Sequence, residues 1–364
     1  MRKVIACMLV VLFALATHGC VGYFPEVIRQ GSREVVEIDD EYEQVDEEAE
    51  PAEPPDMAAA AHVLGGRIVT AEEAANNAKR FAIVGANVVG LQADGTLIKT
   101  DYHAFGAIDG IYDWEGIVAI SASGNNSDNI IGLKSDGTVV IGGTFTEGSA
   151  EAVEGWEDIV SIVGGAGESH FAGLKSDGTV VAFGADALGQ LDVSHWTDIE
   201  RLFIARGVTF GITSDDSIVT AGQLSYSVWE NGQHKGFESY EIDFGEWVDI
   251  VQIIASGTIS GAYGLRADGT IVMSLGFWGD NPWTDIVQLA SKGSSLIGLR
   301  SDGTIAIVGR ALSVWEQEIT QWTDIVAIQA NSHFVVGMKK DGSFEFASSS
   351  NLHQIDISDW NLGY

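Results

Sequence analysis

The chain has 364 residues, 46% of them hydrophobic, and carries 52 acidic against 19 basic residues, a formal net charge of -33. A surface this acidic repels polyanions, so DNA, RNA and acidic lipid headgroups are excluded as favoured partners. Glycine is frequent at 44 residues, proline is rare at 5, and Val and Ile are abundant, which favours strands joined by tight turns. The length allows two average domains or one large repetitive domain.

The first segment, MRKVIACMLVVLFALATHGC, has the features of a secretory signal. Arg2 and Lys3 precede an unbroken apolar run from Val4 to Ala16, and small or polar residues follow. The run is too short to span a bilayer comfortably, which makes a permanent transmembrane anchor the weaker alternative. We expect residues 1–19 to be a signal peptide and the protein to be exported, either as a membrane-anchored lipoprotein or in secreted or periplasmic form.

Cys20 lies where a bacterial lipoprotein signal carries the cysteine that is diacylated after cleavage. Gly19 fits the residue before such a cysteine, whereas Thr17 and His18 stand where these signals usually have Leu and Ala or Ser. The alternative is ordinary cleavage a few residues earlier, without lipidation. Cys7 and Cys20 are the only cysteines, so the mature domain has no disulfide framework and its stability must come from packing.

An acidic linker follows. From Glu34 to Asp56 the chain has twelve acidic residues and no basic one, so like charges repel and little apolar surface can be buried. We expect residues 20–70 to be a disordered tether that holds the folded domain away from a membrane or wall. The alternative is a segment that binds cations or a basic partner. We expect residues 71–364 to form the folded domain. It should begin with a short helix from Ala71 to Lys79.

A short pattern then recurs seven times: Gly, an apolar residue, two further residues and Asp. The copies are GLQADGT, GLKSDGT, GLKSDGT, GITSDDS, GLRADGT, GLRSDGT and GMKKDGS, starting at Gly90, Gly132, Gly173, Gly211, Gly264, Gly298 and Gly337. Their aspartates, from Asp94 to Asp341, are on average about 41 residues apart. This period is expected of propeller blades and of some helical arrays.

The Asp-Gly pair decides between these two architectures. Between apolar runs it favours a two-residue β-hairpin turn, because both central residues need positive φ. In the third copy Ser176 should then face Thr179, and Leu174 should face Val181. Apolar residues on both sides of these strands predict burial on both faces, as between stacked blades.

A tryptophan marks the segment after each hairpin. It begins WEGIVAI, WEDIVSI, WTDIERL, WVDIVQI, WTDIVQL and WTDIVAI, at Trp114, Trp156, Trp196, Trp247, Trp283 and Trp322. The Ile-Val run should form a further buried strand, and the Asp before it in most copies should turn the chain into that strand. We interpret these tryptophans as packing residues rather than ligand contacts.

The stretch HFAGLKSDGTVVAFGADALGQLDVSHWTDI, from His170 to Ile199, resembles the regulator of chromosome condensation repeat, in the shorter form of secreted bacterial proteins. The resemblance covers all seven copies and implies an all-β, seven-bladed β-propeller. The first hairpin, at Gly90, has no Trp before it, and the last Trp, Trp360, has no hairpin after it. We therefore expect N- and C-terminal strands to pair and close the ring, which removes exposed edges.

What the resemblance implies for function is less specific. The founding member exchanges nucleotide on a small GTPase and binds chromatin through a basic tail and particular loops, neither of which is recognisable in this acidic chain. Secreted bacterial relatives include a propeller that inhibits a β-lactamase by docking on it. Protein binding is thus the more transferable expectation, and it rests on analogy of fold.

Departures from the repeat mark candidate binding surfaces. The fourth copy has Asp216 in place of the turn glycine and is followed by an insertion from Gln223 to Trp247. Aromatic residues on loops commonly anchor partners, and the insertion supplies five of them. The candidates are Tyr226, Trp229, Phe237, Tyr240 and Phe244, with a lesser set of Tyr102, Phe105 and Tyr112 after the first hairpin. The alternative is that these aromatics only cover the edge of a blade.

Motifs of catalysis are missing from the sequence. It contains no Gly-x-Ser-x-Gly elbow, no His-Glu-x-x-His, no Walker loop and no Ca²⁺ loop. We expect an exported, monomeric, non-enzymatic propeller without cofactor or metal that binds another protein at the cell envelope. Three alternatives stay open: a carbohydrate-binding or carbohydrate-acting propeller, a purely structural envelope protein, and an enzyme in which two carboxylates converge with one pKa raised.

Overall fold

The computed structural model describes residues 69–100, 108, 110–123, 128–145, 149–165, 170–205, 207–230, 233–255, 261–274, 283–308, 313–348, 357 and 359–362. The expected signal peptide, Cys20 and nearly all of the acidic linker lie outside these residues and stay predictions. Within them, no helix combines the length and the apolar character needed to cross a membrane.

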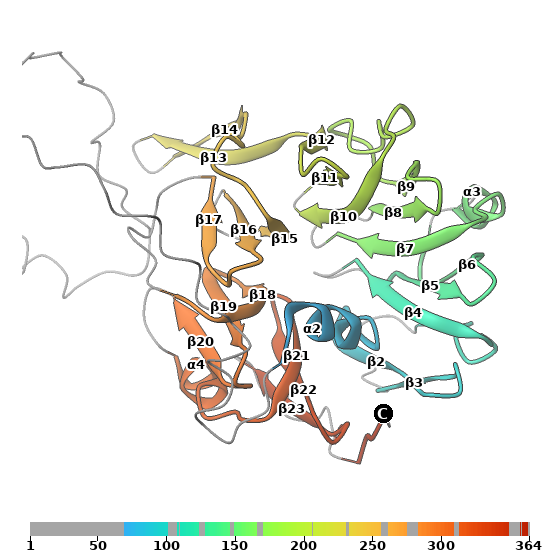
Figure 1. The fold of residues 1–364 in the computed structure, drawn as a ribbon, viewed down its shortest axis with the longest axis vertical. Coiled ribbons are helices and arrows are strands. Elements are labelled where there is room, and N and C mark those ends of the chain that lie inside the picture. Colours follow the sequence, from blue (N-terminus) through green and yellow to red (C-terminus); the bar gives the residue numbers. More distant parts are fainter. Residues whose placement is uncertain are drawn as a thin grey trace, which may run out of the picture. The chain divides into compact units, whose positions relative to one another are not determined.

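The described residues form seven three-stranded antiparallel sheets, each built from three consecutive strands (Figure 1). The strands are, sheet by sheet, β1 (Phe81–Val84), β2 (Asn87–Leu91) and β3 (Leu97–Lys99); β4 (Ile117–Ala122), β5 (Ile130–Lys134) and β6 (Val139–Gly142); β7 (Ile159–Gly164), β8 (His170–Lys175) and β9 (Val180–Gly184); β10 (Ile199–Ala205), β11 (Val208–Thr213) and β12 (Ile218–Gly222); β15 (Ile250–Ala255), β16 (Ala262–Arg266) and β17 (Ile271–Met273); β18 (Ile286–Lys292), β19 (Ser295–Arg300) and β20 (Ile305–Val308); and β21 (Ile325–Ala330), β22 (Phe334–Lys339) and β23 (Phe344–Ser348). We number these sheets 1 to 7.

Few other elements interrupt this pattern. The helices are α2 (Ala71–Ala78), α3 (Ser149–Val153) and α4 (Val314–Ile319). Strands β13 (Leu224–Glu230) and β14 (Gln233–Tyr240) form a separate two-stranded sheet between sheets 4 and 5 in the sequence. The tip of that hairpin, Ser227–Phe237, belongs to a compact unit distinct from the one that holds the seven sheets.

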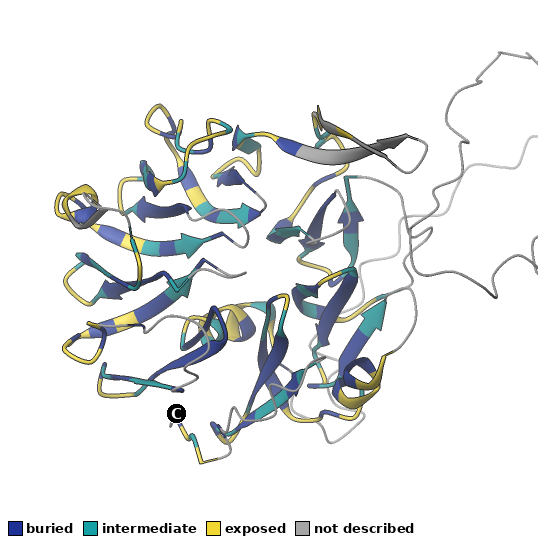
Figure 2. Cartoon of the chain, turned by 180° about the vertical axis from the view of Figure 1, so that it is seen from behind, coloured by how far each residue is buried: buried dark blue, intermediate teal, exposed yellow. Residues whose placement is uncertain are grey.

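The seven sheets follow one another in a closed circuit. The first strand of each sheet contacts the first strand of the next, and β21 of the last sheet contacts β1 of the first. The middle strand of each sheet is buried almost throughout, as Figure 2 shows, whereas several first strands carry exposed residues near their start. Burial on both faces of the middle strands confirms the stacking that the apolar pattern predicts.

The Asp-Gly turns have three loop residues rather than two. In the third copy Leu174 pairs with Val180, not with the residue after it, so the predicted register was wrong by one position. Only Gly178 has a positive φ, 80°, while Asp177 accepts hydrogen bonds from both the amide (3.0 Å) and the hydroxyl (2.6 Å) of Thr179. This side-chain capping favours a turn that ends in a left-handed glycine, because Asp then needs no left-handed conformation.

The tryptophans pack as predicted. In each of sheets 2 to 7 the Trp ring lies against the glycine that starts the hairpin motif of the same sheet. A Cβ built on Gly173 would be 2.9 Å from the ring of Trp156, and one on Gly132 would be 2.7 Å from the ring of Trp114. The repeated glycine therefore makes room for the indole, and in sheets 3 to 7 the Asp before the first strand turns the chain with a left-handed φ, such as 60° at Asp158.

Sheet 1 receives its tryptophan from the C-terminus. Trp360 and Leu362 lie against Gly90, where a built Cβ would be 3.1 Å from the indole and 2.9 Å from the leucine side chain. Residues 349–356, which should supply the terminal strand, are outside the described part, so strand pairing between the termini stays a prediction. In the described part β1, β2 and β3 alone make up this sheet, and the C-terminal contact is side-chain packing plus a hydrogen bond from Arg80 to the Leu362 carbonyl.

A backbone hydrogen bond recurs where one sheet meets the next, a place that we call a junction and number after the earlier sheet. The carbonyl of the turn glycine accepts from the amide that begins the next first strand or, at the seventh junction, from an amide of the C-terminal segment that packs on sheet 1. The donors are Ile117, Ile159, Ile199, Ile286, Ile325 and, at the seventh junction, Leu362, at 3.0 to 3.4 Å. Six of the seven junctions between the described sheets have this bond.

Helix α2 covers part of the circuit. It contacts β18, β21 and β1, and its Ala74 is fully buried in the same cluster as Val326 of β21. Thr70 caps the helix, accepting from the Glu73 amide at 3.1 Å while the Glu73 carboxylate accepts from the Thr70 amide at 3.0 Å. This capping box and the alanine spacing explain why the segment is helical, as the sequence predicts.

Candidate binding site at the fourth junction

The fourth junction, between sheets 4 and 5, is the exception to the repeated bond. Its turn has Asp216 where the other six turns have glycine, and Asp216 holds a left-handed φ of 62°. Among the described residues, Ile250 makes no hydrogen bond to the Asp216 carbonyl, although its six counterparts all bond to theirs. The departure seen in the sequence thus coincides with a missing contact in the structure.

The side chain of Asp216 accounts for the missing bond. A Cβ built on Gly178 would lie 3.1 Å from the Asp198 amide nitrogen, and one on Gly269 would lie 3.0 Å from the Ile286 amide nitrogen. Such distances are tighter than most real Cβ contacts, so a residue with a Cβ at the turn requires the next strand to shift by a few tenths of an ångström. Asp216 has that Cβ, which accounts for the absence of the repeated bond from the Ile250 amide.

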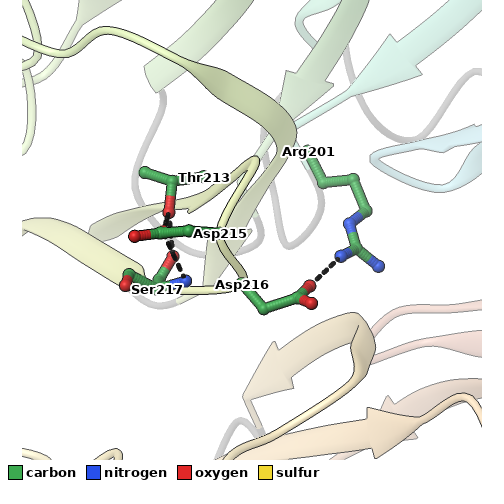
Figure 3. A network of polar contacts seen from close by, with 5 residues as sticks. All are labelled: Arg201, Thr213, Asp215, Asp216 and Ser217. Atoms are coloured by element: carbon green, nitrogen blue, oxygen red, sulfur yellow. Dashed lines mark hydrogen bonds and ion pairs between the residues drawn. The ribbon is translucent and has the colours of Figure 1, made fainter.

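An ion pair holds this unusual turn (Figure 3). Arg201 Nη2 lies 2.9 Å from Asp216 Oδ1, and both side chains are partly exposed. In sheets 2, 3, 5, 6 and 7 the position of Arg201 is occupied by a small or amide residue, namely Ala119, Ser161, Gln252, Gln288 and Ala327, and in sheet 1 the register places Arg80 there. Sequence reasoning overlooked Arg201, and the signal that could have found it is a basic residue three positions after the marker Asp, where the other Trp-marked segments have Ala, Ser or Gln.

The turn next to the ion pair keeps the chemistry of the other copies. Asp215 Oδ1 accepts from the Thr213 hydroxyl (2.5 Å) and from the Ser217 amide (3.2 Å), as Figure 3 shows. These donors, the hydroxyl first, hold the pKa of Asp215 below its ordinary value. Two carboxylates and one guanidinium therefore lie at the surface of this junction, with the Asp215 charge already satisfied by its own turn.

An exposed valine adds apolar surface at the same place. Val248 precedes the first strand of sheet 5 and is 55% exposed, whereas the equivalent residues are the polar Glu115, Glu157, Thr197, Thr284 and Thr323. Phe244, proposed from the sequence as a binding residue, is instead partly buried. Its ring lies edge-on to Trp247 at 5.4 Å and to Phe210 at 6.5 Å. For Phe244 this is the packing that the covering alternative predicts.

The insertion after sheet 4 forms the β13–β14 hairpin. Leu224, at its start, is buried in the cluster between sheets 4 and 5. The side chains of Tyr226, Trp229, Phe237 and Tyr240 fall outside the described part, so their role stays a prediction. The hairpin is the covalent connection between the two sheets of the fourth junction, which places every departure of the fourth copy in one continuous part of the chain.

The lesser aromatic set is only partly described. Tyr102 and Phe105 are outside the described residues. Tyr112 is 60% exposed, and the ammonium group of Lys99 lies 5.2 Å from the centre of its ring. Tyr112 is thus available to a partner, but the structure does not bring it together with the fourth junction through any described contact.

Sequence reasoning also missed a polar cluster between sheets 6 and 7. Lys292 donates to the Ser332 carbonyl at 2.9 Å and lies 4.9 Å from the ring of Trp315, and burial lowers its pKa. Glu316 accepts from the Ser295 hydroxyl at 2.5 Å. These groups satisfy one another and join helix α4 to the sheets. No three His, Cys, Asp or Glu residues of the described ranges are grouped so that they could hold a metal ion.

Solved structures share this fold at low sequence identity. The ectodomain of the receptor kinase CR4 from Physcomitrella patens is 15% identical with a TM-score of 0.52, covering 74% of this chain and 72% of that one. The CRINKLY WD40 ectodomain of the receptor kinase ACR4 from Arabidopsis thaliana is 12% identical with a TM-score of 0.50, covering 76% and 96%. Prp20p from Saccharomyces cerevisiae is 13% identical with a TM-score of 0.38, covering 78% and 75%.

Comparisons of sequence add nothing to this likeness, because neither the protein-family models nor the curated proteins yield a match. At such low identities the structural likeness bears on the fold alone. The chain is a seven-sheet repeat β-propeller of the kind that its resemblance to the regulator of chromosome condensation predicts.

Proposed function

We propose that the protein is an exported propeller that binds another protein at the cell envelope through its fourth copy, whose departures from the repeat lie, along the chain, at the fourth junction and in the β13–β14 hairpin. The observation that carries this proposal is the coincidence of departures at one junction. Asp216 and Val248 each replace the residue type that the repeat has elsewhere, Arg201 replaces the small or amide residue of five other copies, and the longest insertion lies between the same two sheets. Stability alone gives no reason for all four to gather there.

The composition of the surface indicates what kind of partner fits. Glu200, Asp215, Glu246 and Asp249 are exposed around the junction, and the whole chain carries -33 charges. Such a surface favours a partner with basic or neutral contact residues and disfavours an acidic one. The exposed Val248 adds the apolar contact area on which protein interfaces depend at their centre.

Two further points support export and binding. The N-terminal segment has the pattern of a secretory signal. Two similar structures, with TM-scores of 0.52 and 0.50, are described as ectodomains of receptor kinases. We assign no catalysis, because the polar groups at the junction are used by the turn and its ion pair.

The test is affinity capture from envelope extract, with the chain lacking residues 1–19 as bait. A first variant replaces Ser225–Tyr240 with a short Gly-Ser turn and keeps Phe244, which packs on Trp247. A second variant, Val248→Thr, restores the residue type of the other copies. The matched control is Val160→Thr, at a valine that is equally exposed, 55%, but lies in β7 of sheet 3.

We expect one protein to be retained by the unmodified chain and by the Val160 control, and to be lost or weakened at least five-fold in the other two. Retention of the same protein by all four would move the binding surface away from the fourth junction. Retention of none, with circular dichroism showing that all four fold, would contradict protein binding, and glycan arrays would then test the carbohydrate alternative.

A further inference from the structure

We propose that the fourth junction is a built-in opening point, at which sheets 4 and 5 separate reversibly while the other six junctions stay closed. This inference goes beyond the proposed function, since it concerns the motion of the protein itself and holds whether or not a partner is found. It follows from a comparison of the seven junctions, which provide their own internal controls.

The fifth, sixth and seventh junctions are closed by side-chain amides. Gln252 both donates to and accepts from the Leu289 backbone, at 3.0 and 2.7 Å, and Gln288 does the same with Ile328, at 3.0 and 2.8 Å. At the seventh junction Gln329 donates to the Phe81 carbonyl at 2.7 Å. Each side-chain amide makes hydrogen bonds to the unpaired edge of a neighbouring first strand, where an additional strand would otherwise bond.

The first three junctions have other polar links. The Ile120 amide donates to the Lys79 carbonyl at 3.0 Å, next to sheet 1. The Gly164 amide donates to the Ser121 hydroxyl at 2.9 Å. His170 Nε2 lies 3.2 Å from the Thr209 hydroxyl. Sheets 1 to 4 are thus connected in sequence by hydrogen bonds besides the repeated one.

At the fourth junction the described residues of sheets 4 and 5 share no hydrogen bond of either kind. Arg201 stands where Gln252 and Gln288 make their bonds, and it turns back to Asp216 of its own sheet. What the described residues of the two sheets share is apolar packing, which includes Phe210, Ile212 and Ile253. Such packing is not directional. The two sheets can therefore separate there without depriving hydrogen-bonded backbone groups of their partners.

The chain connection permits the same motion. Asp215 and Asp268, the turn aspartates on either side of this junction, are 53 positions apart, the longest spacing in the repeat. A long connection between two sheets adds little restraint to their separation. The Asp216 Cβ stands in the way of the repeated backbone bond, and the ion pair with Arg201 holds that side chain in place.

Hydrogen–deuterium exchange of the whole chain tests whether the fourth junction opens. Exchange is measured by mass spectrometry of peptides that cover the segment after each marker tryptophan. After correction for intrinsic rates, we expect amides of 249–255 to exchange at least ten-fold faster than those of 158–164 and 285–291. Asp216→Gly should slow 249–255 at least five-fold, because it removes the Cβ and permits the repeated bond. Asp216→Asn keeps the Cβ and tolerates the left-handed φ, so exchange should stay fast.

Gly178→Asp is the matched transplant, since it places the same side chain in the third turn. It should speed exchange of 198–205 while 249–255 is unchanged, and circular dichroism together with exchange in sheets 6 and 7 checks that each variant folds. Equal protection of 249–255 and its counterparts in the unmodified chain would overturn the proposal. So would an Asp216→Gly variant that folds and exchanges at the original rate.

Discussion

At the scale of single residues, the fold depends on a glycine that leaves room for an indole. Gly173 faces the ring of Trp156 closely enough that an added methyl group would lie 2.9 Å from it. Interiors with the density of crystals cannot absorb such an insertion without shifts of side chain or backbone. We predict that Gly173→Ala lowers the free energy of unfolding by about 1–3 kcal/mol, measured by urea denaturation.

Gly155→Ala is the control for that prediction. No atom lies within 4 Å of a Cβ built at Gly155, and its φ is not in the left-handed region. The substitution should change stability by less than about 0.5 kcal/mol, or raise it slightly through the unfolded state. If both substitutions had the same effect, the contact with the indole would not be what fixes glycine in the repeat.

At the scale of elements, three junctions have a glutamine amide that bonds across neighbouring strands. Gln288 is 6% exposed, and both of its polar atoms bond to the backbone of Ile328. Gln288→Ala would leave a buried N–H and a buried carbonyl without partners. We predict a loss of about 2–4 kcal/mol in the free energy of unfolding. The exposed Gln321→Ala serves as control, and a similar loss there would refute the explanation.

Helix α2 gives one repeat position two different environments. Val326 in β21 is 3% exposed and belongs to the cluster that contains Ala74 of the helix, whereas its counterpart Val118 in β4 is 52% exposed. We predict that Val326→Ala lowers the free energy of unfolding by about 2 kcal/mol and that Val118→Ala changes it by less than about 0.5 kcal/mol. Chemical denaturation of both variants measures the difference, and comparable losses would mean that the helix contributes no cover.

At the scale of the whole molecule, the repeat made the fold predictable. Seven copies of the hairpin motif, six of them with Asp-Gly, and seven marker tryptophans specify the number of sheets and the faces that are buried, because the side chains of each copy pack in the same way. The register of the turns was not predictable in the same way. It depends on whether Asp177 adopts a left-handed φ or caps Thr179, and both are compatible with the residues Asp-Gly-Thr.

The candidate site was predictable in location but not in structure. Asp216 and the insertion are visible as departures from the repeat. The partnership of Arg201 with Asp216 depends on strand register, and the missing bond of Ile250 depends on where a Cβ would lie against the next sheet. The sequence also could not show that Phe244 packs inward, since an aromatic residue on a loop is compatible with covering and with binding.

The net charge of the whole molecule leads to the last prediction. With -33 charges at pH 7, repulsion between carboxylates opposes the compact state, and salt screens that repulsion over about 10 Å at 0.1 M. Raising NaCl from 20 mM to 500 mM at pH 7 should therefore raise Tm by roughly 2–4 °C, about 1 kcal/mol. Differential scanning fluorimetry measures Tm. Sucrose at the same concentration controls for preferential exclusion, and KCl at the same concentration controls for specific ion binding.

Acid should act in two opposing ways. Hydrogen bonds from the residues two positions away, chiefly their hydroxyls, lower the pKa values of six turn aspartates, Asp94, Asp136, Asp177, Asp215, Asp268 and Asp341. A lowered pKa in the folded state contributes stability above the ordinary value of 3.8 that is lost as the pH falls below it. Acid also reduces the net negative charge and with it the repulsion, so Tm should rise from pH 7 to about pH 5 and fall steeply below about pH 4. A Tm that falls steadily from pH 7, or that decreases on addition of NaCl, would show that carboxylate repulsion does not limit the stability of this protein.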